Sequence, residues 1–445
     1  MAHELQELMY LIETGRDRGA QATEVFLEEA EGLTVDIVRG RPQKRAFTER
    51  GLRVRCWVAE GRFGDAEGTP DDGQGLVEKA LAAAHKAPAD PVQSPVGRLP
   101  VVTRGLGIDD RRFPNLSESD RIDVVVAAER GAKGVDPRIK ARDFRYADQR
   151  VRRAYISNNE TLVEERSTTY EAGGRVEVEV PRGPLVLEDF VAGRSFASVS
   201  SFPFGTVLAR RAIALLGDAI GHEGPVRVMM PPRVTGHLFA RLAEGFRHDL
   251  LDTGGSLFAA GFGTGQTVVD GRIHLIDDPQ LPGGLRTQAF DEEGVPPVPL
   301  ALLREGVVEG RYRDLATARR QEIRPTGHRW KGTLRPANLQ LRSGTRSMSA
   351  LLSEHSDVLT LVLDHVEGMW EGLDLATGDF RVRGSGFLQR GNDQVDGVLR
   401  RAWLEGNVLD VLSQLVDIAS DTDRVAHVDA PGMLVEGIRV AATPR

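Results

Sequence analysis

Two His-Glu dipeptides come closest to the residue pattern of a hydrolytic metal site. Zinc peptidases place two His one helical turn apart, so that both imidazoles face one ion, and use a neighbouring Glu to activate water. The dipeptides are His3-Glu4 and His222-Glu223, and the positions where a second His should follow hold Glu7, Leu8, Val226 and Arg227. Because neither dipeptide is followed by a second His, we expect the residues of both dipeptides to be exposed polar residues.

Three consecutive carboxylates, Asp291, Glu292 and Glu293, form the second chemical candidate. Neighbouring carboxylates can serve as general acid and base. The same residues are more typical of a turn whose charges are solvated or pair with Arg. A self-sufficient hydrolase with an unrecognised site around Asp291, Glu292 and His328 is therefore kept as an alternative.

The single cysteine, Cys56, excludes an intrachain disulfide and a multi-cysteine zinc cage. Leu52, Val54, Cys56 and Val58 alternate with other residues along an expected strand. Cys56 is therefore predicted to lie in the core rather than to act as a nucleophile. Ten His remain as possible metal ligands.

The charge balance excludes some partners. The 445 residues include 57 Lys and Arg against 65 Asp and Glu, a formal charge of −8 at pH 7. Nucleic acids and anionic membranes attract concentrated basic charge, so we expect no direct nucleic-acid or membrane partner. The N-terminus lacks the pattern of a secretory signal, and no apolar run approaches the ~18 residues of a spanning helix. We therefore predict a cytoplasmic protein.

The hydrophobic pattern predicts an α+β fold of two domains, each a mainly antiparallel sheet with packed helices. Intervals of three and four residues predict helices over 5–32 (broken near Gly15 and Gly19), 117–134, 235–246 and 408–419. Alternating apolar residues predict strands that include 33–37, 51–59 and 358–366. We place the domains at 1–200 and 201–445, the second being richer in strands.

An ordered series of turns gives the chain a resemblance to the TldD/PmbA family, zinc metallopeptidases that are also described as gyrase modulators. The series includes Ile276-Asp-Asp-Pro279, Phe290-Asp-Glu-Glu-Gly-Val-Pro296, Leu303-Arg-Glu-Gly-Val-Val308, Asp314-Leu-Ala-Thr-Ala318, Pro325-Thr-Gly-His328 and Thr377-Gly-Asp-Phe380. The order and spacing of these segments carry the resemblance, which spans nearly the whole chain.

The resemblance implies two subunit types, of which the TldD type carries His-Glu-x-x-x-His on a helix and a Cys near the chain end. On the matching helix of this chain, Gly236 and His237 stand in place of His-Glu, and Arg241 stands in place of the second His. Residues 420–431 contain no Cys. An Arg would put a cation where a dication should bind. The chain therefore resembles the TldE (PmbA) type, and we expect it to have no metal ligands and no catalytic residues.

The resemblance further implies a heterodimer in which the TldD-type partner holds zinc. Such a pair degrades unfolded peptides or trims leader segments from ribosomally made peptide natural products. Five residues are candidates for lining the substrate path or the interface: Asp291, Glu292, Glu293, Thr326 and His328. The remaining alternative is a regulatory protein that acts on a gyrase or on a toxin–antitoxin system.

Overall fold

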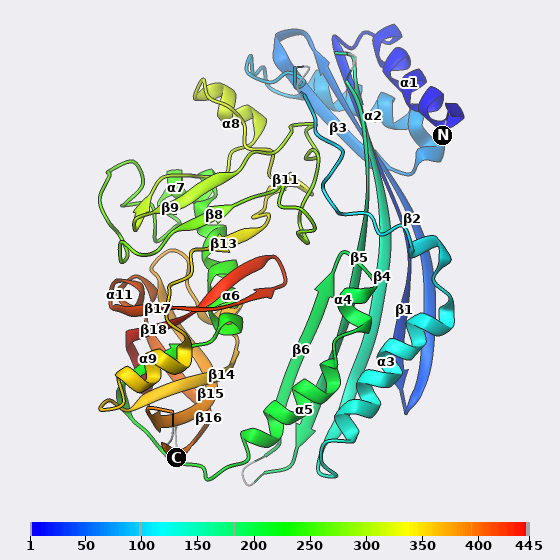
Figure 1. The fold of residues 1–445 in the computed structure, drawn as a ribbon. Helices are drawn as coiled ribbons and strands as arrows, with labels where there is room; N and C mark the ends of the chain where they lie inside the picture. The colour runs from blue at the N-terminus through cyan, green and yellow to red at the C-terminus, as the bar shows by residue number, and fades with distance from the viewer. Residues whose placement is uncertain (1, 98–99, 160, 181–182, 393, 442–445) are drawn as a thin grey trace.

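The computed structural model of the chain describes residues 2–97, 100–159, 161–180, 183–392 and 394–441. Helices and strands fall into two halves, each built on one large sheet (Figure 1). The mainly antiparallel pairing and the strand-rich second half confirm the predicted α+β class. No helix in these ranges combines the length and apolar character that crossing a bilayer requires.

The first half contains an antiparallel sheet with the strand order β3-β2-β1-β4-β5-β6. The strands are β1 (Ala22–Val38), β2 (Arg41–Val58), β3 (Arg62–Gly68), β4 (Lys140–Ser157), β5 (Leu162–Val178) and β6 (Leu185–Gly193). The helices are α1 (Ala2–Asp17), α2 (Gly73–Lys86), α3 (Glu118–Lys133), α4 (Ala197–Ser200) and α5 (Phe204–Ala214). Short 3-10 turns cover Ala59–Gly61, Pro70–Asp72 and Phe113–Asn115.

The two faces of β1 meet different partners because successive side chains of a strand point to opposite faces. Val25 and Leu27 lie in a core with α1 and α2, whereas Leu33 lies in a core with α3 and α5. Phe26, on the opposite face, packs against a third core that includes Phe290 of the second half. The first sheet therefore carries its own helices on one face and receives the second half on the other.

The second half contains a mixed sheet with the order β10-β9-β8-β13-β18-β16-β15-β14-β7, with β17 paired to β18. Its strands are β7 (Gly224–Met230), β8 (Leu275–Asp277), β9 (Leu300–Arg304), β10 (Val307–Val308), β13 (Leu339–Leu341), β14 (Thr360–Glu367), β15 (Asp379–Arg390), β16 (Gln394–Asn407), β17 (Leu415–Val425) and β18 (Val428–Ala441). A separate hairpin pairs β11 (Arg329–Trp330) with β12 (Thr333–Leu334).

The helices of the second half are short. They are α6 (Pro232–Leu242), the 3-10 turn Ala243–Phe246, α7 (His248–Thr253), α8 (Leu315–Arg320), α9 (Met348–Glu354), α10 (Met369–Gly372) and α11 (Val408–Ser413). One continuous apolar core joins α6 and the 3-10 turn to the sheet, and in it the Phe246 and Phe258 rings stack 4.3 Å apart. The sheets use residues within 22–193 and 224–441, and the domain division at 200 and 201 stays a prediction.

The helix predicted over 5–32 is wrong beyond its first half. Helix α1 ends at Asp17, and Gly19 follows with a φ of +96°, which favours glycine. From Ala22 the chain forms β1, a central strand paired with β2 on one side and β4 on the other. The helix predicted over 408–419 is wrong in its second half, because β17 pairs with β18. In both cases pairing with distant strands overrides the local pattern.

Cys56 is fully buried in the core beneath α1 and α2, as predicted. Burial raises the pKa of its thiol to about 11, so the reactive thiolate is scarce at neutral pH. We expect the folded chain to consume less than about 0.1 equivalents of a thiol-reactive disulfide reagent, and about one equivalent in denaturant. Rapid stoichiometric reaction of the folded chain would contradict this packing.

Candidate functional site

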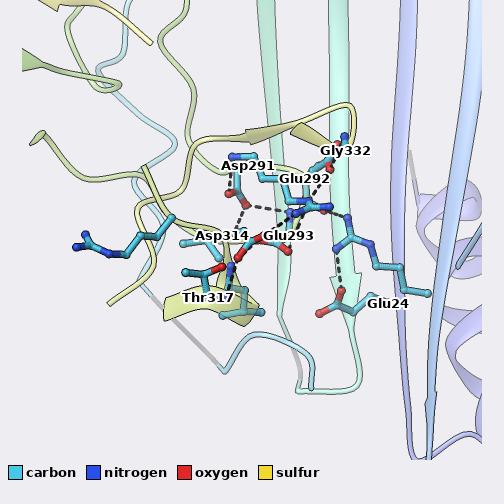
Figure 2. A network of polar contacts seen from close by, with 12 residues as sticks. Glu24, Asp291, Glu292, Glu293, Asp314, Thr317 and Gly332 are labelled. Atoms are coloured by element: carbon cyan, nitrogen blue, oxygen red, sulfur yellow. Dashed lines mark hydrogen bonds and ion pairs between the residues drawn. The ribbon is translucent and has the colours of Figure 1, made fainter. Parts of the chain in front are cut away.

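The acidic turn that begins at Asp291 lies at the junction between the two halves (Figure 2). The Phe290 ring before it meets the Phe26 ring of β1 edge to face, with centroids 6.5 Å apart. Gly294 closes the turn with a φ of +74°, and a Cβ at this position would lie 2.4 Å from the Tyr155 ring of β4. Only glycine fits both the left-handed backbone and this approach, so Gly294 lets the turn descend onto the first sheet.

Arg55 of β2 is the buried cation beneath the turn. Its Nη2 donates to the carbonyl oxygen of Glu292 at 2.8 Å, and its Nη1 lies 3.4 Å from Oε2 of Glu24. Glu24 also accepts hydrogen bonds from the Tyr155 hydroxyl and the Val96 amide. Burial raises the pKa of Glu24, and the charge of Arg55 opposes that rise. A buried charge needs such pairing, so Arg55 ties the turn to the sheet.

Glu292 faces arginines rather than open solvent. Its Oε2 lies 3.0 Å from Nη1 of Arg53, and its Oε1 accepts from the Gly332 amide at 2.9 Å and from Arg329 Nε at 3.2 Å. Burial alone would raise the pKa of Glu292, but the positive charges of Arg53 and Arg55 outweigh burial and lower it. Glu292 is therefore an ionised partner of the junction, and with Arg53 and Trp330 it also lines a cavity of about 550 Å³.

Asp291 and Glu293 bind backbone amides. Oδ1 of Asp291 accepts from the amides of Glu293 at 2.9 Å and Val295 at 3.0 Å, and its Oδ2 accepts from the Arg329 amide at 3.1 Å. Oε2 of Glu293 accepts from the Leu315 amide at 2.9 Å, at the start of α8. These bonds close the turn and attach it to α8 and β11. In this turn Glu292 pairs with arginines, whereas Asp291 binds backbone amides and burial raises its pKa well above the ordinary value.

Thr326 and His328 use a different set of partners. Nδ1 of His328 lies 2.8 Å from the Thr326 carbonyl oxygen and so carries the ring proton, while its Nε2 lies 3.6 Å from Oδ2 of Asp277. The same Oδ2 accepts from the Tyr312 hydroxyl and the Ala337 amide, both at 2.7 Å. Burial lowers the pKa of His328, which is 1% exposed. In the described ranges no hydrogen bond joins the His328 ring to the acidic turn, and the acid–base site predicted around these residues stays a prediction.

Helix α6 and the following 3-10 turn carry the positions of the zinc motif. His237, Arg241 and Glu244 are spaced by four and three residues, so they share one side of the helix. Gly236 packs against the β17–β18 hairpin, and a Cβ there would lie 2.9 Å from Cβ of Val425. The first position of the motif therefore has no room for a His unless the hairpin moves.

Arg286, Arg335 and His427 gather around the His237–Glu244 side of α6. Burial raises the pKa of Glu244, and the charges of Arg286 and Arg335 oppose that rise. Burial and the same two arginines, together with His237, lower the pKa of His427 to about 2. The charges of Arg286 and Arg335 therefore act on two groups near this side of α6, Glu244 and His427.

A cavity of about 190 Å³ adjoins His237. Its walls are residues 189–192 of the edge strand β6, Arg233 and His237 of α6, and residues 423–426 at the tip of the β17–β18 hairpin. Phe190 and Phe202 line the cavity and are 40% and 42% exposed. The cavity therefore places apolar surface next to the former motif position.

The residues around α6 do not fit a zinc ion. His237 and His427 are neutral imidazoles that could serve as ligands, but the charges of Arg233 and Arg211 act on His237 and those of Arg286 and Arg335 act on His427. These positive charges oppose a dication. In the part of the chain that the structure describes, no three His, Cys, Asp or Glu side chains are grouped to hold a metal. The expectation that this chain holds no zinc stays a prediction.

Two family models match most of the chain. The model of the PmbA/TldA metallopeptidase central domain covers residues 111–217, and that of the C-terminal domain covers residues 223–442. The chain belongs to the PmbA/TldD family. The predicted family is therefore confirmed, and the metallopeptidase-like character of the fold with it. The TldE-type role remains to be argued from the site.

Curated and solved relatives agree with this assignment. The metalloprotease PmbA of Escherichia coli O157:H7 is 20% identical over 437 residues, covering 96% of this chain and 93% of that protein. A structure from Thermotoga maritima, described as a candidate modulator of a DNA gyrase, has a TM-score of 0.88 at 22% identity and covers 98% of this chain and 99% of its own. TldE from Thermococcus kodakarensis has a TM-score of 0.84 at 16% identity, with 98% and 100% covered.

The sequence of this PmbA/TldD family member did not indicate which arginines matter at the two sites. Arg53 and Arg55 lie on an alternating strand, where the basic positions predict only the polar face. Arg286 and Arg335 lie in loops next to Gly284 and Pro336 and belong to no motif. Their importance depends on contacts between segments that are far apart in the chain, and local spacing does not encode such contacts.

Replacing Glu292 by Gln should destabilise the fold by about 2 kcal/mol at pH 7, because it removes one partner of a buried ion pair. The pKa of Glu292 is lowered on folding, so its contribution is complete above its ordinary value of 4.5 and is lost as the pH falls through the lowered value. The difference in unfolding midpoint between variant and wild type should therefore shrink as the pH falls below the ordinary value of 4.5 and through the lowered pKa.

Glu67→Gln is the matched control, because Glu67 also pairs with Arg53 but has a side chain that is 58% exposed. We expect this change to cost less than about 0.5 kcal/mol. Equal effects of the two variants, or a Glu292→Gln effect that persists unchanged in acid, would contradict the role given to Glu292.

Gly236→Ala tests the packing of α6 on the hairpin. At an open helical site this change would stabilise by about 1 kcal/mol, but here the new Cβ meets Val425, so we expect destabilisation by about 1–2 kcal/mol. In a double-mutant cycle by thermal unfolding, Val425→Ala should cost less in the Gly236→Ala background than in the wild type. Additive costs would mean that the two positions do not touch.

Proposed function

We propose that this chain is the TldE-type, non-catalytic subunit of a heterodimeric zinc metallopeptidase, with the zinc held by a TldD-type partner. The observation that carries the proposal is the α6 surface. The first motif position, Gly236, is filled by Val425 of the hairpin, and the second His position is Arg241. A helix that packs in this way supports a structural or substrate-binding role and offers no geometry for water activation.

The proposed substrate is an unfolded peptide, including the leader segment of a ribosomally made natural product. Strand β6 ends the first sheet in the strand order, and the cavity beside His237 adjoins its residues 189–192. An extended chain can pair with a sheet edge through backbone hydrogen bonds, with little dependence on sequence. A cavity of about 190 Å³ accepts a side chain but no folded domain. These features support a substrate path for extended chains.

We assign the acidic turn to the junction between the halves rather than to the substrate path. Asp291, Glu292 and Glu293 bond to Arg53, Arg329 and backbone amides, and Thr326 and His328 are buried within the second half. This assignment leaves the partner interface to other surfaces. A cytoplasmic location follows from the proposed role and stays a prediction.

The test compares the chain alone with the chain co-expressed with a relative that carries His-Glu-x-x-x-His and a late Cys. We expect the isolated chain to purify without stoichiometric zinc and to leave an unfolded peptide uncleaved. The co-expressed chains should purify together with about one zinc per pair and cleave the peptide. Zinc content is measured by elemental analysis and cleavage by chromatography.

The matched control is a pair in which the first His of the partner's motif is replaced by Ala. This pair should assemble but lose zinc and cleavage. Zinc and activity in the isolated chain would contradict the proposal and favour the self-sufficient hydrolase. Capture of gyrase by the isolated chain, with no complex formed by the TldD-type chain, would instead favour the regulatory alternative.

A further inference from the structure

Arg335 differs from three other half-buried arginines of the chain. Arg53, Arg211 and Arg329 each pair with at least two carboxylates. Within the described ranges, the Arg335 guanidinium has no hydrogen bond or ion pair and contacts only the face of Trp330, at 4.7 Å from the ring centroid. A half-buried guanidinium that stacks on a ring while its N–H groups stay unpaired is prepared to bind an anion.

Arg286 is also poorly satisfied. It donates one side-chain hydrogen bond, from Nη1 to the carbonyl oxygen of Pro336, the residue after Arg335, at 2.8 Å. The guanidinium groups of Arg335 and Arg286 together carry about ten N–H donors. In the described structure, this bond is the one hydrogen bond that the two side chains make.

Two carboxylates, Glu244 and Asp277, act on the charge of Arg286, and in the described residues the Glu244 carboxylate has no hydrogen bond or ion pair. Burial is the main cause that lowers the pKa of Arg335 to about 9, and the charges of Arg286 and Arg153 add to it. Nε2 of His427 is buried and lacks a partner in the described structure. An anion beside Arg335 would satisfy its unpaired N–H groups.

The orientation of Arg335 is fixed from both halves of the molecule. Trp330, on the β11–β12 hairpin, lies between Arg335 and Arg153 of β4, whose guanidinium lies 3.9 Å from the ring centroid. Arg153 is itself held by Glu28 and Glu165. The stack therefore holds the planar fork of Arg335 in place before any ligand arrives, which lowers the entropy lost on binding.

We propose that Arg335, with Arg286, binds a carboxylate of the peptide substrate, either its C-terminal carboxylate or an acidic side chain. The inference rests on the proposed function for the identity of the ligand, because carboxylates are the anions of an unmodified peptide. Arginine matches a carboxylate bidentately.

The experiment measures binding of fluorescent peptides to the isolated full-length chain and KM in the two-chain complex. Three otherwise identical unfolded peptides are compared: a free C-terminus without acidic residues, a C-terminal amide without acidic residues, and a C-terminal amide with one internal Glu. We expect wild type to bind at least one carboxylate-bearing peptide about tenfold more tightly than the neutral amide. The better of the two identifies the source of the carboxylate.

Arg335→Gln should remove that tenfold preference and raise KM for the preferred peptide, with kcat and the neutral amide little affected. Arg335→Lys should restore part of the preference, because the charge remains while the fork is lost. Arg324→Gln is the matched control: Arg324 is exposed and has no polar partner in the described structure, so its loss should change nothing. Unchanged unfolding midpoints show that each variant is folded.

Equal affinity of wild type for all three peptides overturns the carboxylate site, and this comparison requires no variant to fold. Displacement of peptide by inorganic phosphate, with no preference among the peptides, would make the cluster a general anion site and also overturn the proposal. If the two-chain complex does not form or cleave, the proposed function fails separately, while the binding measurement on the isolated chain still decides the carboxylate site.

Discussion

The buried guanidinium of Arg55 is the constraint on which the junction depends. It is 8% exposed, and its charge is tolerated only because Glu24 of its own sheet and the Glu292 carbonyl of the other half both reach it. If the turn moved away, a buried cation would lose a hydrogen bond and gain no water. The same turn sends the Glu292 side chain to the Gly332 amide, and so fixes the β11–β12 hairpin. The position of the β11–β12 hairpin therefore depends on the contact between Arg55 of the first sheet and the acidic turn.

The second half shows how one helix surface can change its chemistry while keeping its fold. Residues four and three apart on α6 still converge on one place, as a metal site requires, but here they are His237, Arg241 and Glu244. A dication is opposed by neighbouring guanidinium groups, and an anion is attracted by them. The close packing of Gly236 on Val425 removes the remaining option of adding a ligand at the preceding residue. The packing of Gly236 and the positive charges near α6 therefore both oppose zinc binding at this helix.

The sequence was informative wherever the deciding interaction is local. Ser117 caps α3 with a reciprocal bond to Asp120, and the alternation around Cys56 places it in the core. It was misleading at β1, where intervals of three and four arise in a central strand that distant strands pair on both edges. Arg335 could not have been singled out, because its significance lies in the absence of a partner, and that depends on the packing of both halves.

The stack around Trp330 connects the acidic turn to Arg335. Glu292 holds the hairpin through Gly332, the hairpin presents Trp330, and Trp330 orients Arg335 against Arg153 of the first sheet. A ligand that binds Arg335 in this orientation stabilises the contacts that hold Arg335 there. By thermodynamic linkage, those contacts raise the affinity for the ligand by the same free energy. Occupation of the arginine cluster should therefore stabilise the junction of the two halves. The buried pairs under the acidic turn then have a consequence for binding at Arg335, which none of them contacts.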